Sequence, residues 1–268
     1  VDGQEKQCHA DLIVGADGIR SVVRKLLIKE ERSPLRYLDC MVILGICPLK
    51  ALDNLRSDLL DSATVFQTAN GHERIYVMPF DAQSVMWQLS FPMAEDEARA
   101  RSAQGAEALK NEARRRLPWH SPIPEILAAT DPTLISGYPV YDREGLEAES
   151  LEQAGPATLL GDAAHPMSPF KGQGANQALL DALELARAIS KGCTPHSDWR
   201  KLGIRKAVLN AYESTMLDRS AVKVKDSHDA AAFLHSEIVL HEGDEPRGRC
   251  RNSSSADSPS MKPNRGKN

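Results

Sequence analysis

The sequence predicts an α/β protein with an inserted antiparallel β-sheet and C-terminal helices. Two short, unbroken apolar runs, at residues 11–16 and 157–161, each precede a helical pattern, as parallel strands buried on both faces do. Residues 40–91, between these units, are short runs of β-branched and aromatic residues separated by turns. Residues 198–236 have a helical pattern. The predicted order is therefore strand–helix, antiparallel insert, strand–helix, and further helices.

The first strand–helix unit has the sequence ADLIVGADGIRSVVRKLLIKEE. Its strand, Leu12 to Val14, runs into Gly15 and an Asp17-Gly18 turn. A short helix follows, with Ser21 near its N-cap, because a serine hydroxyl accepts a hydrogen bond from the first helical turn.

The insert contains four predicted strands, with the sequences CMVILGICPL, ATVFQTA, ERIYVMPF and SVMWQLSF. Asn70-Gly71 favours a hairpin turn between the second and third strands. Residues 81–84 separate the third from the fourth. Connections this short predict an antiparallel sheet.

The segment after this sheet is charged and rich in alanine. Residues 94–117 predict a solvated helix, weakened at Gly105. The sequence SPIPEILAAT predicts a short helix started by prolines, and TLISGYPVYDR predicts a return to strand.

The second strand–helix unit has its strand at Ala157 to Gly161 and a helix over 173–191, closed by Gly192. This helix carries a stripe that we expect to pack against the sheet: Ala175, Ala178, Leu179, Ala182, Ala186 and Ile189. The sequence then becomes polar and rich in serine, which predicts a disordered tail over 241–268.

Composition excludes several classes of function. The net charge of −4 over 268 residues gives no basis for binding nucleic acid. No apolar run approaches the roughly 20 residues of a membrane-spanning helix. The five cysteines are widely spaced without a C-x-x-C, which favours reduced thiols in the cytoplasm over disulfides or a zinc site. The sequence assigns no metal ligands and no oligomeric state.

The chemistry is concentrated at residues 159–176. Asp162 follows an apolar strand, where ligands of open α/β sheets bind, and its carboxylate can accept hydrogen bonds from a polyol. Gly172 and Gly174 let the backbone approach a flat ligand. The helix that begins near Gly174 presents free N–H groups to a ring that becomes anionic. A polyol joined to such a ring describes the ribityl chain and isoalloxazine of a flavin.

The same residues resemble a known family. GDAAHPMSPFKGQGANQALLDA resembles the second flavin-binding motif of the FAD-dependent aromatic hydroxylases, which are flavoprotein monooxygenases similar to para-hydroxybenzoate hydroxylase. LIVGADGIRSVVRK resembles the Asp-Gly motif of that family. The resemblance covers about residues 10–235. It implies a Rossmann-like FAD-binding domain interrupted by an antiparallel sheet that forms the substrate wall.

The resemblance also implies roles for individual residues. Asp162 would bind the ribityl chain, and Pro169 would lie beside the flavin. The backbone facing the flavin pyrimidine would be that of Gly172, Gln173, Gly174, Ala175 and Asn176. Asp17 and Gly18 would contribute to binding FAD and NAD(P)H, and Arg20 and Arg24 in the same motif are candidates for phosphate contacts.

Two further groups of residues are interpreted with the family in view. We expect His165 to be structural rather than a general base, because no partner carboxylate is identifiable, and no catalytic side chain is assigned. On the predicted substrate wall we expect most large side chains to be core and one or two to line a pocket, among Tyr76, Met78, Phe80, Trp87 and Gln88.

One element of the family pattern is missing. The G-x-G-x-x-G turn that cradles the FAD pyrophosphate does not occur in this sequence. We therefore expect an N-terminally truncated, incomplete FAD-binding domain, and weak FAD binding by residues 1–268 alone. The predicted division is 1–35 and 140–195 for the FAD-binding domain, 36–139 for the substrate-type sheet with its helices, 196–240 for C-terminal helices and 241–268 for the tail.

The predicted function is an FAD-dependent monooxygenase that uses NAD(P)H and dioxygen to hydroxylate an aromatic or similar apolar small molecule. The alternatives are a reductase or epoxidase of the same fold, or an inactive truncated fragment. A halogenase is disfavoured because Trp87 stands without the W-x-W-x-I-P motif.

Overall fold

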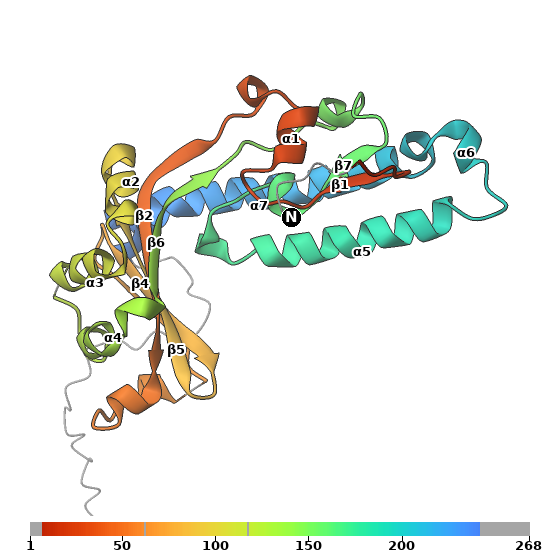
Figure 1. Ribbon diagram of the computed structural model, residues 1–268. Coiled ribbons are helices and arrows are strands. Elements are labelled where there is room, and N and C mark those ends of the chain that lie inside the picture. The colour runs from red at the N-terminus through yellow and green to blue at the C-terminus, as the bar shows by residue number, and fades with distance from the viewer. Residues whose placement is uncertain (1–6, 62, 117, 242–268) are drawn as a thin grey trace, which may run out of the picture.

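The computed structural model describes residues 7–61, 63–116 and 118–241. Figure 1 shows a large sheet covered on one face by α2, α3 and α4, and a small sheet, β1 with β7, that lies beside the long helices α5 and α7. Apart from His241, the predicted disordered tail lies outside the described residues. No helix among the described residues combines the length and apolar character needed to span a membrane.

The large sheet has five strands in the order β3-β4-β5-β2-β6. Their bounds are β2 Arg36–Pro48, β3 Phe66–Ala69, β4 Arg74–Asp81, β5 Ser84–Pro92 and β6 Ile135–Asp142. All neighbouring pairs are antiparallel, which confirms the predicted sheet. The predicted return to strand is also confirmed, and β6 pairs with β2 rather than with the small sheet.

Three helices cover one face of this sheet: α2 Glu95–Ala103, α3 Ala106–Arg115 and α4 Ile123–Ala129. The prediction of one continuous, solvated helix over 94–117 is wrong. Gly105 has a φ of +85°, a left-handed conformation that separates α2 from α3. Leu109 and Ala113 are buried against the sheet, so α3 is amphipathic rather than fully solvated.

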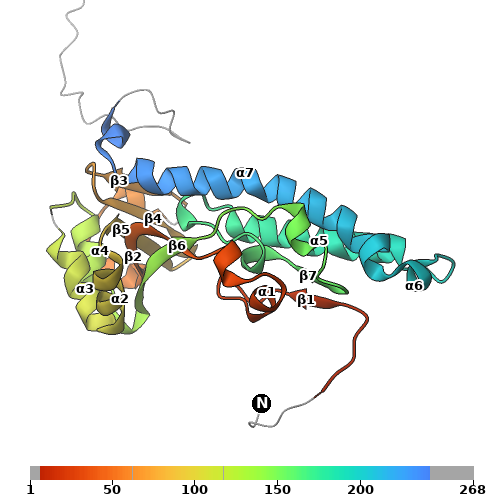
Figure 2. The ribbon, with the colours of Figure 1, turned by 90° about the horizontal axis from the view of Figure 1, so that it is seen from above.

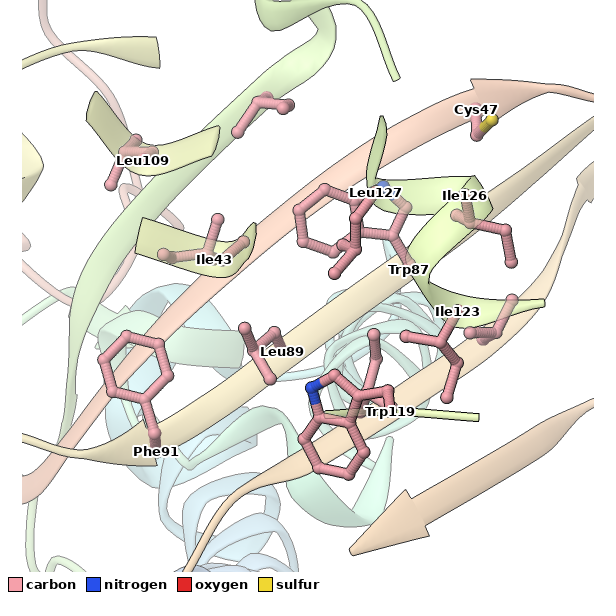
Figure 3. Close-up of a cluster of buried hydrophobic side chains, with 14 of the residues drawn as sticks. Ile43, Cys47, Trp87, Leu89, Phe91, Leu109, Trp119, Ile123, Ile126 and Leu127 are labelled. Atoms are coloured by element: carbon pink, nitrogen blue, oxygen red, sulfur yellow. The ribbon is translucent and has the colours of Figure 1, made fainter. Parts of the chain in front are cut away.

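The main core fills the space between the sheet and these helices. Figure 3 shows Trp87 and Leu89 of β5 beneath Ile123, Ile126 and Leu127 of α4. Trp87 is fully buried, and its indole Nε1 donates to Thr130 Oγ1 at 2.9 Å. Trp87 is therefore a core residue, as expected of most large side chains on this sheet.

The small sheet consists of β1 Ile13–Gly15 and β7 Ala157–Leu159, paired in parallel as predicted. Helix α1, Val22–Leu27, follows β1, and Ser21 Oγ accepts from Arg24 N, which confirms the predicted N-cap. The expectation that β1 is buried on both faces is wrong for the described chain. Ile13 is 54% exposed, because β7 is the one strand that pairs with β1 among the described residues.

Two long helices follow β7: α5 Gly174–Gly192 and α7 Asn210–Leu234. Between them lie α6, Trp199–Leu202, and a π-helical turn, Arg205–Leu209. Figure 2 shows α7 running along the molecule from the β1–β7 sheet to the five-stranded sheet. Near its end, Ala230 and Ala231 pack with residues of the sheet face opposite to α2–α4. The 3₁₀ turns are Glu30–Arg32, Leu49–Leu52, Asp58–Leu60, Pro132–Leu134, Ala148–Leu151, Gly161–Ala163, Pro169–Lys171 and Glu237–Leu240.

The buried face of α5 differs from the predicted apolar stripe. Leu179 of that stripe is 71% exposed, and Ala175, Ala182 and Ala186 are also exposed. The buried positions are Gln177, Asp181 and Leu185, spaced four residues apart. A polar face points inward because Arg219 of α7 and the backbone N–H of Gly161, in the turn after β7, lie there as its partners.

The close approach of β2 to Trp87 generates a prediction. A Cβ at Gly45 would lie 2.7 Å from the Trp87 ring, so Gly45→Ala should lower the free energy of unfolding by about 1–3 kcal/mol. Gly145→Ala is the matched control, because its Cβ would meet neighbours at no less than 3.7 Å. Chemical denaturation measures both variants. Equal stability of the two would contradict this account of the core.

Candidate functional site

A hollow of about 330 Å³ lies where β1 and β7 end. It brings together the two motifs singled out in the sequence. The lining residues are Ala16, Gly18, Leu160, Gly161, Asp162, Gly174, Ala175 and Ala178. This is the place where open α/β sheets bind ligands, at the carboxyl ends of parallel strands.

Asp162 supplies the charge of this hollow. It lies on the 3₁₀ turn Gly161–Ala163, directly after β7, and its side chain is exposed. Its carboxylate accepts no hydrogen bond from any residue that the structure describes. Neighbouring residues still displace part of the water around its carboxylate, which raises the pKa of Asp162, and the nearby His165 opposes this shift. Asp162 is therefore an acceptor available to a ligand.

The loop before α5 shapes the opposite wall. Gly172 has a φ of +61° and ends the turn Pro169–Lys171. A Cβ at Gly174 would lie 3.8 Å from Asp162 Oδ1, so its absence leaves room beside the carboxylate. The first N–H groups of α5 have no acceptor within the helix and favour negative charge.

The predicted contacts of this loop are only partly gathered at the hollow. Gly174 and Ala175 line it. The other predicted residues lie in the adjoining loop and the first turn of α5: Pro169, Gly172, Gln173 and Asn176. Their contact with a flavin stays a prediction.

In the Asp-Gly motif, Gly18 lines the hollow with a φ of +79°, whereas Asp17 caps α1. The Asp17 carboxylate accepts from Ser21 Oγ and from Val22 N at 2.7 Å. The Ser21 hydrogen bond is the main cause of the lowered pKa of Asp17. Asp17 thus fixes the turn that presents Gly18, and direct binding by Asp17 stays a prediction.

The two arginines of this motif have different surroundings. Arg24 is buried, and its guanidinium donates to Ala163 O at 2.8 Å, to Ala164 O at 2.7 Å and to Ser33 Oγ at 2.6 Å. Burial lowers the pKa of Arg24 to about 10. The suggested phosphate contact is therefore wrong for Arg24, which ties α1 to the turn carrying Asp162. Arg20 is exposed, with its guanidinium 5.8 Å from the centre of the Tyr141 ring.

His165 has a partner that the sequence did not reveal. Its Nε2 lies 2.6 Å from Asp181 Oδ2, and both side chains are buried. The same oxygen accepts the backbone N–H of Gly161 at 2.8 Å. A structural role for His165 agrees with this burial, but the argument that it lacks a carboxylate partner is wrong. Asp181 lies on α5, and the fold rather than the sequence spacing brings the two together.

A second group of polar side chains lies on the sheet face opposite to α2–α4. Arg74 of β4 is 5% exposed, and its Nε donates to Gln67 Oε1 at 3.0 Å. Its guanidinium lies 5.1 Å from the Tyr76 ring centre and 6.0 Å from that of Phe170. No carboxylate pairs with Arg74 within the described ranges, and burial lowers its pKa to about 10.

The Arg74 group faces the loop that leads to α5. Phe170 belongs to the turn Pro169–Lys171, and its ring packs edge-on against His235 at 5.1 Å. Gln88 pairs with Tyr76 across the sheet, and its buried Nε2 has no protein partner among the described residues. The sequence signal for Arg74 was the alternation of Arg74 and Tyr76 with the core residues Ile75 and Val77.

The fold and the hollow define a class: an α/β protein with a strand-end carboxylate and a helix N-terminus at the place where open α/β sheets bind ligands. The chain belongs to the family described as "FAD binding domain", whose model matches residues 1–203. FAD is thus the cofactor of its family. The predicted fold, an α/β domain with an inserted antiparallel sheet, is confirmed.

Several known proteins similar to this chain are monooxygenases by name. Aurachin C monooxygenase/isomerase of Stigmatella aurantiaca is 35% identical over 189 residues, covering 70% of this chain and 44% of that protein. The 3-amino-4-hydroxybenzoate 2-monooxygenase of Streptomyces cremeus is 28% identical over 236 residues, covering 88% and 52%. Klebsiella pneumoniae HpxO complexed with FAD and uric acid has a TM-score of 0.68 at 22% identity, covering 85% and 53%. The chain spans about half the length of the curated relatives it matches.

The two arginines of the Asp-Gly motif give a testable contrast. Arg24→Ala should lower the free energy of unfolding by about 1.5–3 kcal/mol, because buried acceptors lose a charged donor. Arg20→Ala should lower it by less than about 1 kcal/mol, since it removes one exposed cation–π contact. Thermal and urea unfolding measure both. A larger loss of stability for Arg20→Ala would contradict the assigned surroundings.

Proposed function

We propose that this chain carries the flavin-binding turn and the substrate-facing sheet of an FAD-dependent monooxygenase. The reaction would use NAD(P)H and dioxygen to hydroxylate an aromatic or similar apolar small molecule in the cytoplasm. The observation that carries the proposal is the Asp162 carboxylate, which has no hydrogen-bond partner in the described part of the chain and lies in a hollow shared by both sequence motifs. The monooxygenase names of similar proteins support it.

The residues of the hollow fit FAD by their donor and acceptor chemistry. Asp162 would accept hydrogen bonds from hydroxyls of the ribityl chain. The free N–H groups at the start of α5 would donate to the flavin ring and stabilise negative charge on it. Bound FAD would supply the transfer of two electrons from NAD(P)H and the reaction with dioxygen.

Arg74 and its neighbours would bind the substrate. A buried guanidinium without a carboxylate partner favours a ligand that brings an anionic oxygen. Tyr76 and Phe170 provide aromatic surface beside Arg74. Similar proteins are named for 3-amino-4-hydroxybenzoate and 6-hydroxynicotinate, which are aromatic carboxylates. We therefore propose an aromatic substrate with a carboxylate or phenolate group.

The assignment of Asp162 predicts a specific loss of cofactor affinity. Asp162→Ala removes a charge-assisted acceptor worth about 1.5–3 kcal/mol, so Kd for FAD should rise about 10- to 150-fold. Titration of the apo-protein with FAD, followed by flavin fluorescence, measures this ratio. Asp218→Ala, on the exposed side of α7, is the matched control and should leave Kd unchanged. Unaltered affinity in Asp162→Ala would refute the flavin site.

Turnover tests the reaction type, on this chain and on any longer natural form that contains it. A monooxygenase consumes NAD(P)H and dioxygen together in the presence of substrate. Oxidation of NAD(P)H without oxygen uptake would indicate a reductase instead. Oxygen uptake that yields an epoxide would indicate an epoxidase, the activity named for a protein 29% identical to this chain over 208 residues, zeaxanthin epoxidase of Solanum lycopersicum.

The substrate proposal predicts a charge-specific effect at Arg74. Arg74→Gln should weaken binding of an aromatic carboxylate about tenfold or more, because a buried carboxylate loses its cation. Binding of the matching aromatic carboxamide should change by less than about threefold. Ligand-induced changes in the absorbance of bound flavin measure both, with Arg56→Gln as the exposed control. Equal effects on the acid and the amide would argue against charge recognition.

A further inference from the structure

We propose that Asp181 is a positioning residue that holds the Asp162 turn in its ligand-binding geometry. Asp181 does not line the hollow, and it would act through the backbone of Gly161 and through His165. This inference rests on the proposed function, because it concerns the same flavin site.

The Asp181 carboxylate uses both of its oxygens inside the protein. Oδ2 accepts the Gly161 N–H at 2.8 Å and lies 2.6 Å from His165 Nε2. Oδ1 accepts from Arg219 Nη2 of α7 at 2.9 Å. The carboxylate is fully buried, so these contacts replace the water that it has lost. One side chain of α5 therefore connects α7 with the turn that carries Asp162.

The turn needs such a contact because its backbone is unusual. Gly161 has a φ of +57°, and a Cβ there would lie 3.0 Å from the Ala178 Cβ. The strand ladder has already ended, since the last N–H that bonds to β1 is that of Leu160, which donates to Gly15 O at 3.0 Å. The Gly161 N–H thus has Asp181 as its acceptor, and the next residue is Asp162.

The surrounding charges keep Asp181 ionised at neutral pH. Burial alone would raise the pKa of Asp181, but hydrogen bonds from His165 and Gly161 N, with Arg219, outweigh it and leave that pKa lowered. Arg219 also pairs with Glu184 at 2.7 Å and donates to Gln177 Oε1 at 2.6 Å. An ionised Asp181 accepts from Nε2 of His165, which fixes that ring nitrogen as the protonated one.

This arrangement explains why α5 buries polar residues. Gln177, Asp181 and Glu184 all contact Arg219. Of these three, Asp181 alone contacts the turn through a hydrogen bond among the described residues. An asparagine at 181 has a single acceptor oxygen and an NH₂ group, so it cannot reproduce the three contacts. Its NH₂ group would face a donor, either Arg219 or the Gly161 N–H, so the hydrogen bond that sets the direction of Asp162 would be weakened.

A double-mutant cycle separates positioning from a general structural role. Asp181→Asn should raise Kd for FAD about tenfold in the wild-type background. In the Asp162→Ala background the same change should raise it less than about twofold, because the group that Asp181 positions is gone. Arg219→Gln, which leaves Asp181 in place, should give a smaller rise that is likewise lost in the Asp162→Ala background.

The controls distinguish the possible failures. Glu184 contacts Arg219 but not the turn, so Glu184→Gln should leave Kd for FAD within about twofold of wild type. Equal effects of Asp181→Asn in both backgrounds, or an equal effect of Glu184→Gln, would overturn the positioning role. In that case, weaker FAD binding by Asp162→Ala still supports the flavin site. If Asp162→Ala binds FAD as wild type does, the proposed function itself fails.

Discussion

The turn from Gly161 to Ala163 is held between two buried charges of opposite sign, one from α1 and one from α5. Arg24 donates to the carbonyls at the end of the turn, and Asp181 accepts the N–H at its start. The cation therefore meets carbonyl oxygens, and the carboxylate meets an N–H group, so each charge contacts backbone atoms of opposite partial charge. Helix α1 supplies one charge and α5 the other, so the two sequence motifs meet physically at this turn.

The two faces of the five-stranded sheet have different roles. One face packs against α2–α4 through Trp87 and its apolar neighbours, and this face provides stability. The other face carries Arg74 beside the loop that leads to α5. Because strands alternate their side chains, both faces come from the same short runs of sequence. The apolar face could be recognised from the composition of the strands. The role of Arg74 on the polar face could not, because it depends on Phe170, which the fold brings beside it.

Local pattern was sufficient to predict most elements. Ser21 and Asn70-Gly71 act within a few residues of themselves, so these helix and strand ends followed from sequence. Asp162 was found because its motif is contiguous. Partners that meet through the fold were not found: Asp181 is far in sequence from Arg219 and Arg24 from Ala163. The apolar stripe of α5 misled because periodicity shows that a helix has faces, but not which face meets a charged neighbour.

Helix α7 spans the distance between the two polar regions. Arg219, in the first half of α7, contacts Asp181, while His235, directly after the end of α7, lies 2.8 Å from Ser90 of the sheet. Between them, Ser227 O accepts from Ser168 Oγ at 2.6 Å. A helix has a fixed rise and rotation per residue, so α7 sets the distance and the angle between these contacts. One residue inserted between Arg219 and Ser227 would advance everything beyond it by about 1.5 Å and rotate it by about 100°. An insertion here would therefore break the contacts of His235 and Ser227 without any change in their identity, whereas a surface loop could accommodate it.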